Sequence, residues 1–82
     1  MEQNAKQPFN VVFGQVMRAE RLKKNWCLEA IKTATGIAET TLSQIERGMI
    51  NITVNKMEKI VLALGFTLTE FFDKPEFKER TL

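Results

Sequence analysis

The sequence predicts an all-α fold of five short helices in one domain. Apolar residues recur at the three- and four-residue spacing of a helix face, and no segment shows the strict alternation of a β-strand. A glycine follows each of three predicted helices, where it can adopt the left-handed conformation without steric cost. The 82 residues leave no room for a second domain, and no internal repeat is present.

The first predicted helix covers residues 9–24 and follows a flexible polar leader, residues 1–8. Pro8 suits the start of this helix because the donor that proline lacks would be unpaired there, and Asn25 suits its end. The inward stripe of this helix consists of Val12, Phe13, Val16 and Met17.

Two further helices, residues 28–35 and 39–47, are separated by a tight turn at Gly36. Leu42 and Ile45 lie three positions apart and point the second of these helices toward the core. The other side chains of that helix are mostly polar and therefore face away from the core.

Thr53 is expected to cap a fourth helix, residues 54–64, whose apolar positions repeat over three turns. Thr69 is expected to cap a short fifth helix. We place the folded domain at residues 9–72 and expect residues 73–82 to form a charged tail, either frayed or with one more helical turn.

The composition excludes several kinds of site. With one cysteine, Cys27, and no histidine, the chain has neither an internal disulfide nor the ligands for a protein zinc site. We expect no enzyme activity, because there is no phosphate-binding loop, no activated nucleophile and no evident pair of catalytic carboxylates. No cofactor, metal or small-molecule ligand is therefore expected. Without a membrane-spanning run or a signal peptide, the protein is expected in the cytoplasm.

The net charge of +2 is too small to indicate a nucleic-acid partner by itself. Basic residues concentrate between Arg18 and Lys32, where five of them are opposed by two acidic residues. Such a run is more often a solvated helix face than a binding surface, so the adjoining motif has to decide between the two.

The most informative segment is residues 28–48, LEAIKTATGIAETTLSQIERG. It combines a helix, a turn marked by glycine and a second helix, an arrangement that sets two helices at a steep angle. The second helix then projects its polar face outward, where it can enter the major groove of DNA. An ordinary helical hairpin with a solvated face would share the same outline.

Small polar side chains on that outward face suit contact with bases. Gln44 can pair bidentately with adenine, and Glu39 can either accept from a cytosine amino group or repel phosphate at wrong sites. Arg47, one turn further on, can reach either a phosphate or a guanine edge. The residues predicted to contact DNA from this helix are Ala38, Glu39, Thr40, Thr41, Ser43, Gln44 and Arg47.

The run TTLSQIERG, residues 40–48, closely resembles the Xre/Cro–repressor family of helix-turn-helix regulators, the lambda-repressor-like DNA-binding domains. Arg21, Gly36 and the Leu64–Gly65 pair also match the pattern of that family, and the resemblance covers about residues 13–72. It implies a five-helix lambda-repressor-like fold. It implies base contacts from Glu39, Thr40, Ser43 and Gln44.

The same resemblance implies phosphate contacts from Arg21, the N-terminal end of the second helix, Asn51 and Thr53. It also implies that Glu46 is structural and ties its helix to the surroundings through Arg21. The chain departs from the family pattern in three places. Cys27 and Leu28 stand where the family has serine and glutamine. Lys32 stands where it has alanine, and Glu20 where it has an apolar residue.

Residues 47–72 also resemble the controller proteins of restriction–modification systems, which are stand-alone dimers. The predicted recognition helix lacks the arginine and tyrosine that are common in that group. Aromatic residues crowd the end of the chain, and Phe66 and Leu68 are expected to fill part of the core. The number of apolar side chains also predicts an apolar patch covered by a second subunit, and the predicted interface residues, Leu68 again among them, are Leu68, Phe71 and Phe72.

The sequence thus predicts a DNA-binding transcriptional regulator that acts as a homodimer on a pseudo-palindromic operator, with control of a restriction–modification operon as the narrower hypothesis. The alternative is an antitoxin that binds both double-stranded DNA and a partner toxin.

Overall fold

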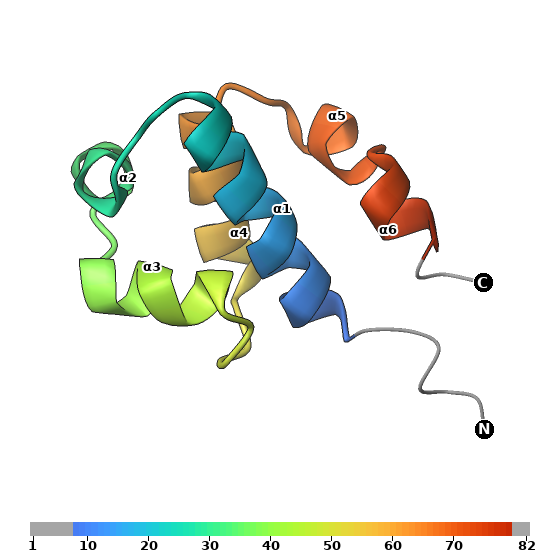
Figure 1. Cartoon of the computed structure of the whole chain (residues 1–82), viewed down its shortest axis with the longest axis horizontal. Helices are drawn as coiled ribbons and strands as arrows, with labels where there is room; N and C mark the ends of the chain where they lie inside the picture. Colours follow the sequence, from blue (N-terminus) through green and yellow to red (C-terminus); the bar gives the residue numbers. More distant parts are fainter. Residues whose placement is uncertain (1–7, 80–82) are drawn as a thin grey trace.

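The structure, a computed structural model, describes residues 8–79, and six helices but no strand occur among them (Figure 1). The predicted all-α fold class is confirmed. Helices α1 and α4 lie at the centre, α2 and α3 lie on one side of them, and α5 and α6 lie on the other (Figure 1). In chain order the helices are α1 (Phe9–Lys23), α2 (Leu28–Thr35), α3 (Glu39–Glu46), α4 (Val54–Ala63), α5 (Leu68–Phe72) and α6 (Pro75–Glu79).

The core is one cluster of buried apolar side chains to which all six helices contribute. The predicted stripe of α1 is buried, and so are Leu42 and Ile45 of α3. Ile60, Val61 and Leu64 continue this core at the C-terminal end of α4, with no exposed surface at all. Because these apolar positions recur at helical spacing, each helix turns one face inward and leaves its polar face in solvent.

The ends of α1 to α4 follow the predicted signals closely. Asn25, with φ of 58°, takes the left-handed conformation just beyond α1, and Gly36 does the same after α2 with φ of 79°. The hydroxyl oxygen of Thr53 accepts a hydrogen bond from the backbone N–H of Lys56 at 3.3 Å, as an N-cap residue should. Cys27 is exposed and is the N-cap residue of α2, where its side chain makes no capping hydrogen bond.

The start of α5 differs from the prediction, because Thr67 and not Thr69 is its N-cap. Thr67 accepts from the backbone N–H of Glu70 at 3.1 Å, and the Glu70 carboxylate accepts from the Thr67 backbone N–H at 3.0 Å. This reciprocal capping box requires an acid or amide three residues after the cap. Thr69 is followed at that distance by Phe72, which cannot return a hydrogen bond.

The segment expected to be a charged tail contains α6, which agrees with the alternative of one more helical turn, and α6 packs against α1. Phe77 of α6 is buried in the core. All six phenylalanines of the chain form one connected cluster, with neighbouring ring centroids 4.9 to 6.2 Å apart. The packed part of the chain therefore continues past residue 72. The predicted leader, apart from Pro8, lies outside the described residues.

Glu20 of α1 is a buried carboxylate at a position where the family has an apolar residue. It lies 2.7 Å from the ammonium of Lys74 and 3.1 Å from that of Lys23. Burial tends to raise the pKa of Glu20, but the hydrogen bonds from Lys74 and Lys23 outweigh it and hold the pKa below its ordinary value. Lys74 also lies over the ring of Phe66, 4.9 Å from its centroid, and so connects α1 to the α5–α6 end of the molecule.

Candidate nucleic-acid interface

Helix α3 presents the polar face that the sequence predicts. Ala38, Glu39 and Thr40 are exposed at its N-terminal end, and Arg47 is exposed at its C-terminal end. Leu42 and Ile45 on the opposite face are buried. The remaining predicted base-contacting residues are half-buried along the edges of the same face: Thr41, Ser43 and Gln44.

The turn before α3 is held by side-chain hydrogen bonds. The Thr35 hydroxyl donates to the carbonyl oxygen of Ile31 at 2.7 Å and accepts from the backbone N–H of Ile37 at 3.1 Å. Ile37 is buried and anchors the turn from behind. These contacts fix the angle between α2 and α3, which decides how far the polar face projects.

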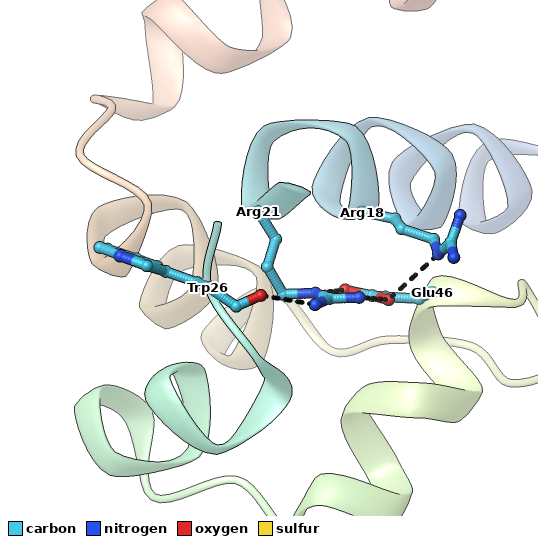
Figure 2. Close-up of polar contacts among 4 residues, drawn as sticks. All are labelled: Arg18, Arg21, Trp26 and Glu46. Carbon is cyan, nitrogen blue, oxygen red and sulfur yellow. Dashed lines mark hydrogen bonds and ion pairs between the residues drawn. The ribbon is translucent and has the colours of Figure 1, made fainter. Parts of the chain in front are cut away.

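An ion pair between α1 and α3 holds the C-terminal end of α3 (Figure 2). Arg21 Nε and Nη2 donate to the two carboxylate oxygens of Glu46 at 2.7 and 2.9 Å, and Nη1 donates to the carbonyl oxygen of Trp26 at 2.7 Å. The two side chains are only 11% and 5% exposed. The hydrogen bonds with Glu46 raise the pKa of Arg21 further above its ordinary value, so Arg21 stays charged. The predicted structural role of Glu46 is thus seen directly.

The structure shows the structural role of Arg21 that the resemblance implies beside its phosphate contact. Each of its three guanidinium nitrogens donates to Glu46 or Trp26, and little of the side chain reaches the surface. We therefore assign Arg21 first to positioning α3, and its phosphate contact stays a prediction. Arg18 lies one turn earlier on α1, and its Nε is 3.9 Å from Glu46 while 60% of the side chain is exposed (Figure 2). The three-residue spacing from Arg21 is the signal by which the sequence could have associated Arg18 with this pair.

The other two predicted phosphate contacts, Asn51 and Thr53, are both exposed in the connection between α3 and α4. The Thr53 oxygen is used as the cap of α4, but its hydroxyl proton can still be donated to an acceptor such as a phosphate oxygen. Lys32, at the position where the family has alanine, is exposed on α2 and does not disturb the helix contacts.

The predicted dimer surface needs one correction. Phe71 has no exposed surface and packs against the rings of Phe13 and Phe66, so it belongs to the core of the monomer. Helix α5 is rotated so that Leu68 and Phe72 face outward instead, and the expectation that Leu68 fills part of the core is wrong, because 37% of it is exposed. They line an apolar groove of about 440 Å³ together with four other residues. These four are Phe9, Val54, Met57 and Phe77.

No helix within residues 8–79 is both long and apolar enough to cross a membrane. The same residues contain no group of three acidic or cysteine side chains placed to hold a metal ion.

Known proteins resemble this chain in sequence. The chain is 36% identical over 64 residues to the control protein C.BamHI of Bacillus amyloliquefaciens, an alignment that covers 77% of this chain and 79% of that protein. It is 32% identical over 63 residues to the HTH-type transcriptional regulator SlrR of Bacillus subtilis (strain 168), covering 76% of this chain. The chain spans only 41% of the length of SlrR.

A solved structure extends the likeness to the fold. The restriction–modification controller protein C.Esp1396I, crystallised as a tetramer in complex with its natural 35 base-pair operator, superposes with a TM-score of 0.79 at 26% sequence identity. The superposition covers 93% of this chain and all of that one. The helix-turn-helix family itself matches residues 17–71, more than half of the sequence. The chain therefore belongs to the Xre-like helix-turn-helix family, with restriction–modification control proteins among its relatives.

Proposed function

We propose that this protein is a sequence-specific transcriptional regulator that binds double-stranded DNA as a homodimer and controls a restriction–modification operon. One observation carries the proposal. The polar face of α3 is open to solvent from Ala38 onward, while Leu42 and Ile45 anchor the helix and Arg21 holds its last residue, Glu46. A helix supported in this way can enter the major groove without losing its packing.

Base recognition is assigned to the exposed and half-buried side chains of α3. Gln44 is suited to an adenine edge, and Glu39 either accepts from a cytosine amino group or disfavours wrong sites. The small side chains Thr40, Thr41 and Ser43 allow a close approach. Phosphate contacts are assigned to Asn51 and Thr53, and Arg47 reaches either a phosphate or a guanine.

The apolar groove is the proposed seat of a second copy of the chain. Leu68 and Phe72 were expected at this interface, and Phe9, Val54 and Met57 extend it. A groove lined by apolar side chains is costly to leave in water, and covering it would stabilise so small a domain. A two-fold dimer presents its two recognition helices about 34 Å apart, one turn of B-DNA, and reads a pseudo-palindrome.

The relatives support this reading over the antitoxin alternative. C.BamHI is a control protein, and C.Esp1396I is a controller protein bound to operator DNA as an oligomer. In this proposal the protein has no catalytic role and acts in the cytoplasm, where it meets its DNA.

The test is a gel shift with the DNA upstream of the protein's own gene, against a scrambled duplex, at two salt concentrations. The protein should bind the upstream DNA more tightly than the scrambled duplex. Both affinities should fall as the salt concentration rises, because the release of condensed counterions is then less favourable. Gln44→Ala should lower the affinity for the operator by roughly 5- to 100-fold. Gln15→Ala, on the exposed side of α1, is the control and should bind as the unchanged protein does. Equal affinity for both duplexes would rule the proposal out.

A further inference from the structure

The connection between α3 and α4, residues 48–53, alternates between inward and outward side chains. Ile50 and Ile52 pack against the core. Met49, Asn51 and Thr53 are exposed, and Met49 shows 61% of its surface. The segment is not a strand, so no ladder of backbone hydrogen bonds enforces this alternation. Something else must decide which of its side chains face outward.

The first turn of α1 supplies that support. The side-chain amide nitrogen Nδ2 of Asn10 donates to the carbonyl oxygens of Gly48 at 3.1 Å and Ile50 at 3.3 Å. An asparagine amide carries two N–H groups, so one side chain can serve both acceptors. The next residue, Val11, lies directly against Gly48, where an added Cβ would be 2.9 Å from Val11 Cγ2. The start of α1 therefore lies beside the connection, as Figure 1 also shows.

We propose that Asn10 is a positioning residue for the phosphate contacts made by Asn51 and Thr53. The inference rests on the proposed function and extends it to a residue that does not itself touch DNA. The hydrogen bonds to the carbonyls of Gly48 and Ile50 fix the peptide group before Met49 and the peptide group after Ile50. Ile50 is then directed inward, and Asn51, the next residue, is directed outward.

The geometry also separates this role from that of Arg21. Arg21 holds the C-terminal end of α3 and acts on the base-reading face. Asn10 holds the segment beyond α3 and acts on the backbone contacts. Loss of Asn10 should therefore weaken binding to specific and scrambled DNA alike and leave the ratio of the two unchanged, because phosphate contacts carry no base information.

The experiment scans an operator duplex in which one backbone phosphate at a time is replaced by a neutral methylphosphonate. Affinities are measured for the full chain and for Asn10→Ala, Asn51→Ala and the double variant, with Gln15→Ala as the matched α1 control. Circular dichroism gives the folded fraction of each protein. Asn10→Ser, which keeps a shorter donor, is measured in parallel so that the result does not depend on the stability of one variant.

The full chain should lose about 10-fold in affinity at the one or two phosphates beneath the connection. For Asn51→Ala and Asn10→Ala, neutralising those phosphates should no longer lower the affinity, whereas neutralising other phosphates should lower it as in the unchanged protein. The double variant should bind no worse than the weaker single variant. If Asn10→Ala keeps its response at those positions, or loses it equally at all positions, Asn10 is structural only and the inference fails. If the full chain does not prefer operator over scrambled DNA, the proposed function fails first.

Discussion

Arg21 on α1 and Glu46 on α3 form a nearly dry bidentate ion pair, in which two guanidinium nitrogens serve the two carboxylate oxygens at 2.7 and 2.9 Å (Figure 2). The third nitrogen donates to the backbone of Trp26. A planar guanidinium matches a carboxylate in two parallel hydrogen bonds, and the fixed geometry adds positional specificity to the energy. The pair therefore sets the position of the last turn of α3 relative to α1.

Arg21→Lys should be strongly destabilising although the charge is kept. A lysine ammonium cannot make the two parallel bonds and also reach the carbonyl of Trp26. A hydrogen bond to a charged group contributes about 1.5–3 kcal/mol, and at least one is lost here, against a total stability of about 5–10 kcal/mol for a domain of this size. Urea unfolding followed by circular dichroism measures the loss. Replacing both residues, Arg21→Met with Glu46→Leu, should cost much less than the two single changes added together. A loss below about 1 kcal/mol in Arg21→Lys would contradict this account.

Gly14→Ala should destabilise the protein, although helix propensity alone predicts the opposite. Alanine is favoured over glycine inside a helix by about 1 kcal/mol. A Cβ at Gly14, however, would collide with the carbonyl oxygen of Ile45 and lie 2.7 Å from that of Glu46. These are backbone atoms of α3, so relief requires the two helices to separate, at about 1–3 kcal/mol. A fall in the unfolding free energy of Gly14→Ala shows that the collision outweighs helix propensity, and a rise shows the reverse. Ala19→Gly, on the exposed face of α1, measures the propensity difference between alanine and glycine without a collision.

The stability contributed by Glu20 should disappear in acid. Its folded pKa lies below the ordinary value of 4.5, so the contribution is complete above about pH 4.5 and is lost as the pH falls through the folded pKa. Glu20→Gln should be less stable than the unchanged protein by about 1–3 kcal/mol at pH 7, and this difference should close below pH 4.5. Thermal unfolding at a series of pH values measures the difference. Glu58→Gln, on the exposed face of α4, should change stability by less than about 0.5 kcal/mol. A difference for Glu20→Gln that is the same at pH 3 and pH 7 would exclude the ion pairs as its cause.

Much of the fold could be predicted from the sequence because local signals and helix packing agree. Thr53 caps α4 in the structure, and Gly36 ends α2, at the positions where side-chain chemistry favours these roles. The outward face of α3 was predictable for the same reason, since Leu42 and Ile45 leave only one way to turn the helix.

The features that the sequence did not predict depend on contacts between residues that are distant in the chain. Nothing local to Glu20 indicates that Lys74, far along the chain, will neutralise it. The neighbours Phe71 and Phe72 are chemically identical, and only the rotation of the short helix α5 makes one core and the other groove. Arg21 was assigned both a structural and a phosphate role, and the hydrogen bonds of its three guanidinium nitrogens can be seen only once Glu46 and Trp26 are placed beside it.

The apolar groove yields a prediction about oligomeric state. Val54 lines it at the start of α4 and is 70% exposed, so Val54→Asp places a charge on the groove without disturbing the core of the monomer. A second copy seated there would have to bury that carboxylate without a partner, which is strongly unfavourable. The variant should be monomeric at concentrations where the unchanged protein is dimeric, as measured by sedimentation equilibrium. Its binding to a full operator should fall by on the order of 100-fold or more, because the two half-sites are then bound independently.

Leu62→Asp provides a matched control, because Leu62 is an exposed apolar residue of the same helix, 56% accessible, that does not line the groove. It receives the same new charge, so any general effect on solubility or on attraction to DNA is shared by the two variants. If the groove is the dimer interface, the two variants should differ in oligomeric state: Val54→Asp should be monomeric and Leu62→Asp should remain dimeric. If both variants dissociate, or if neither does, the second copy binds elsewhere on the molecule, and the pairing of half-sites must be sought on another face.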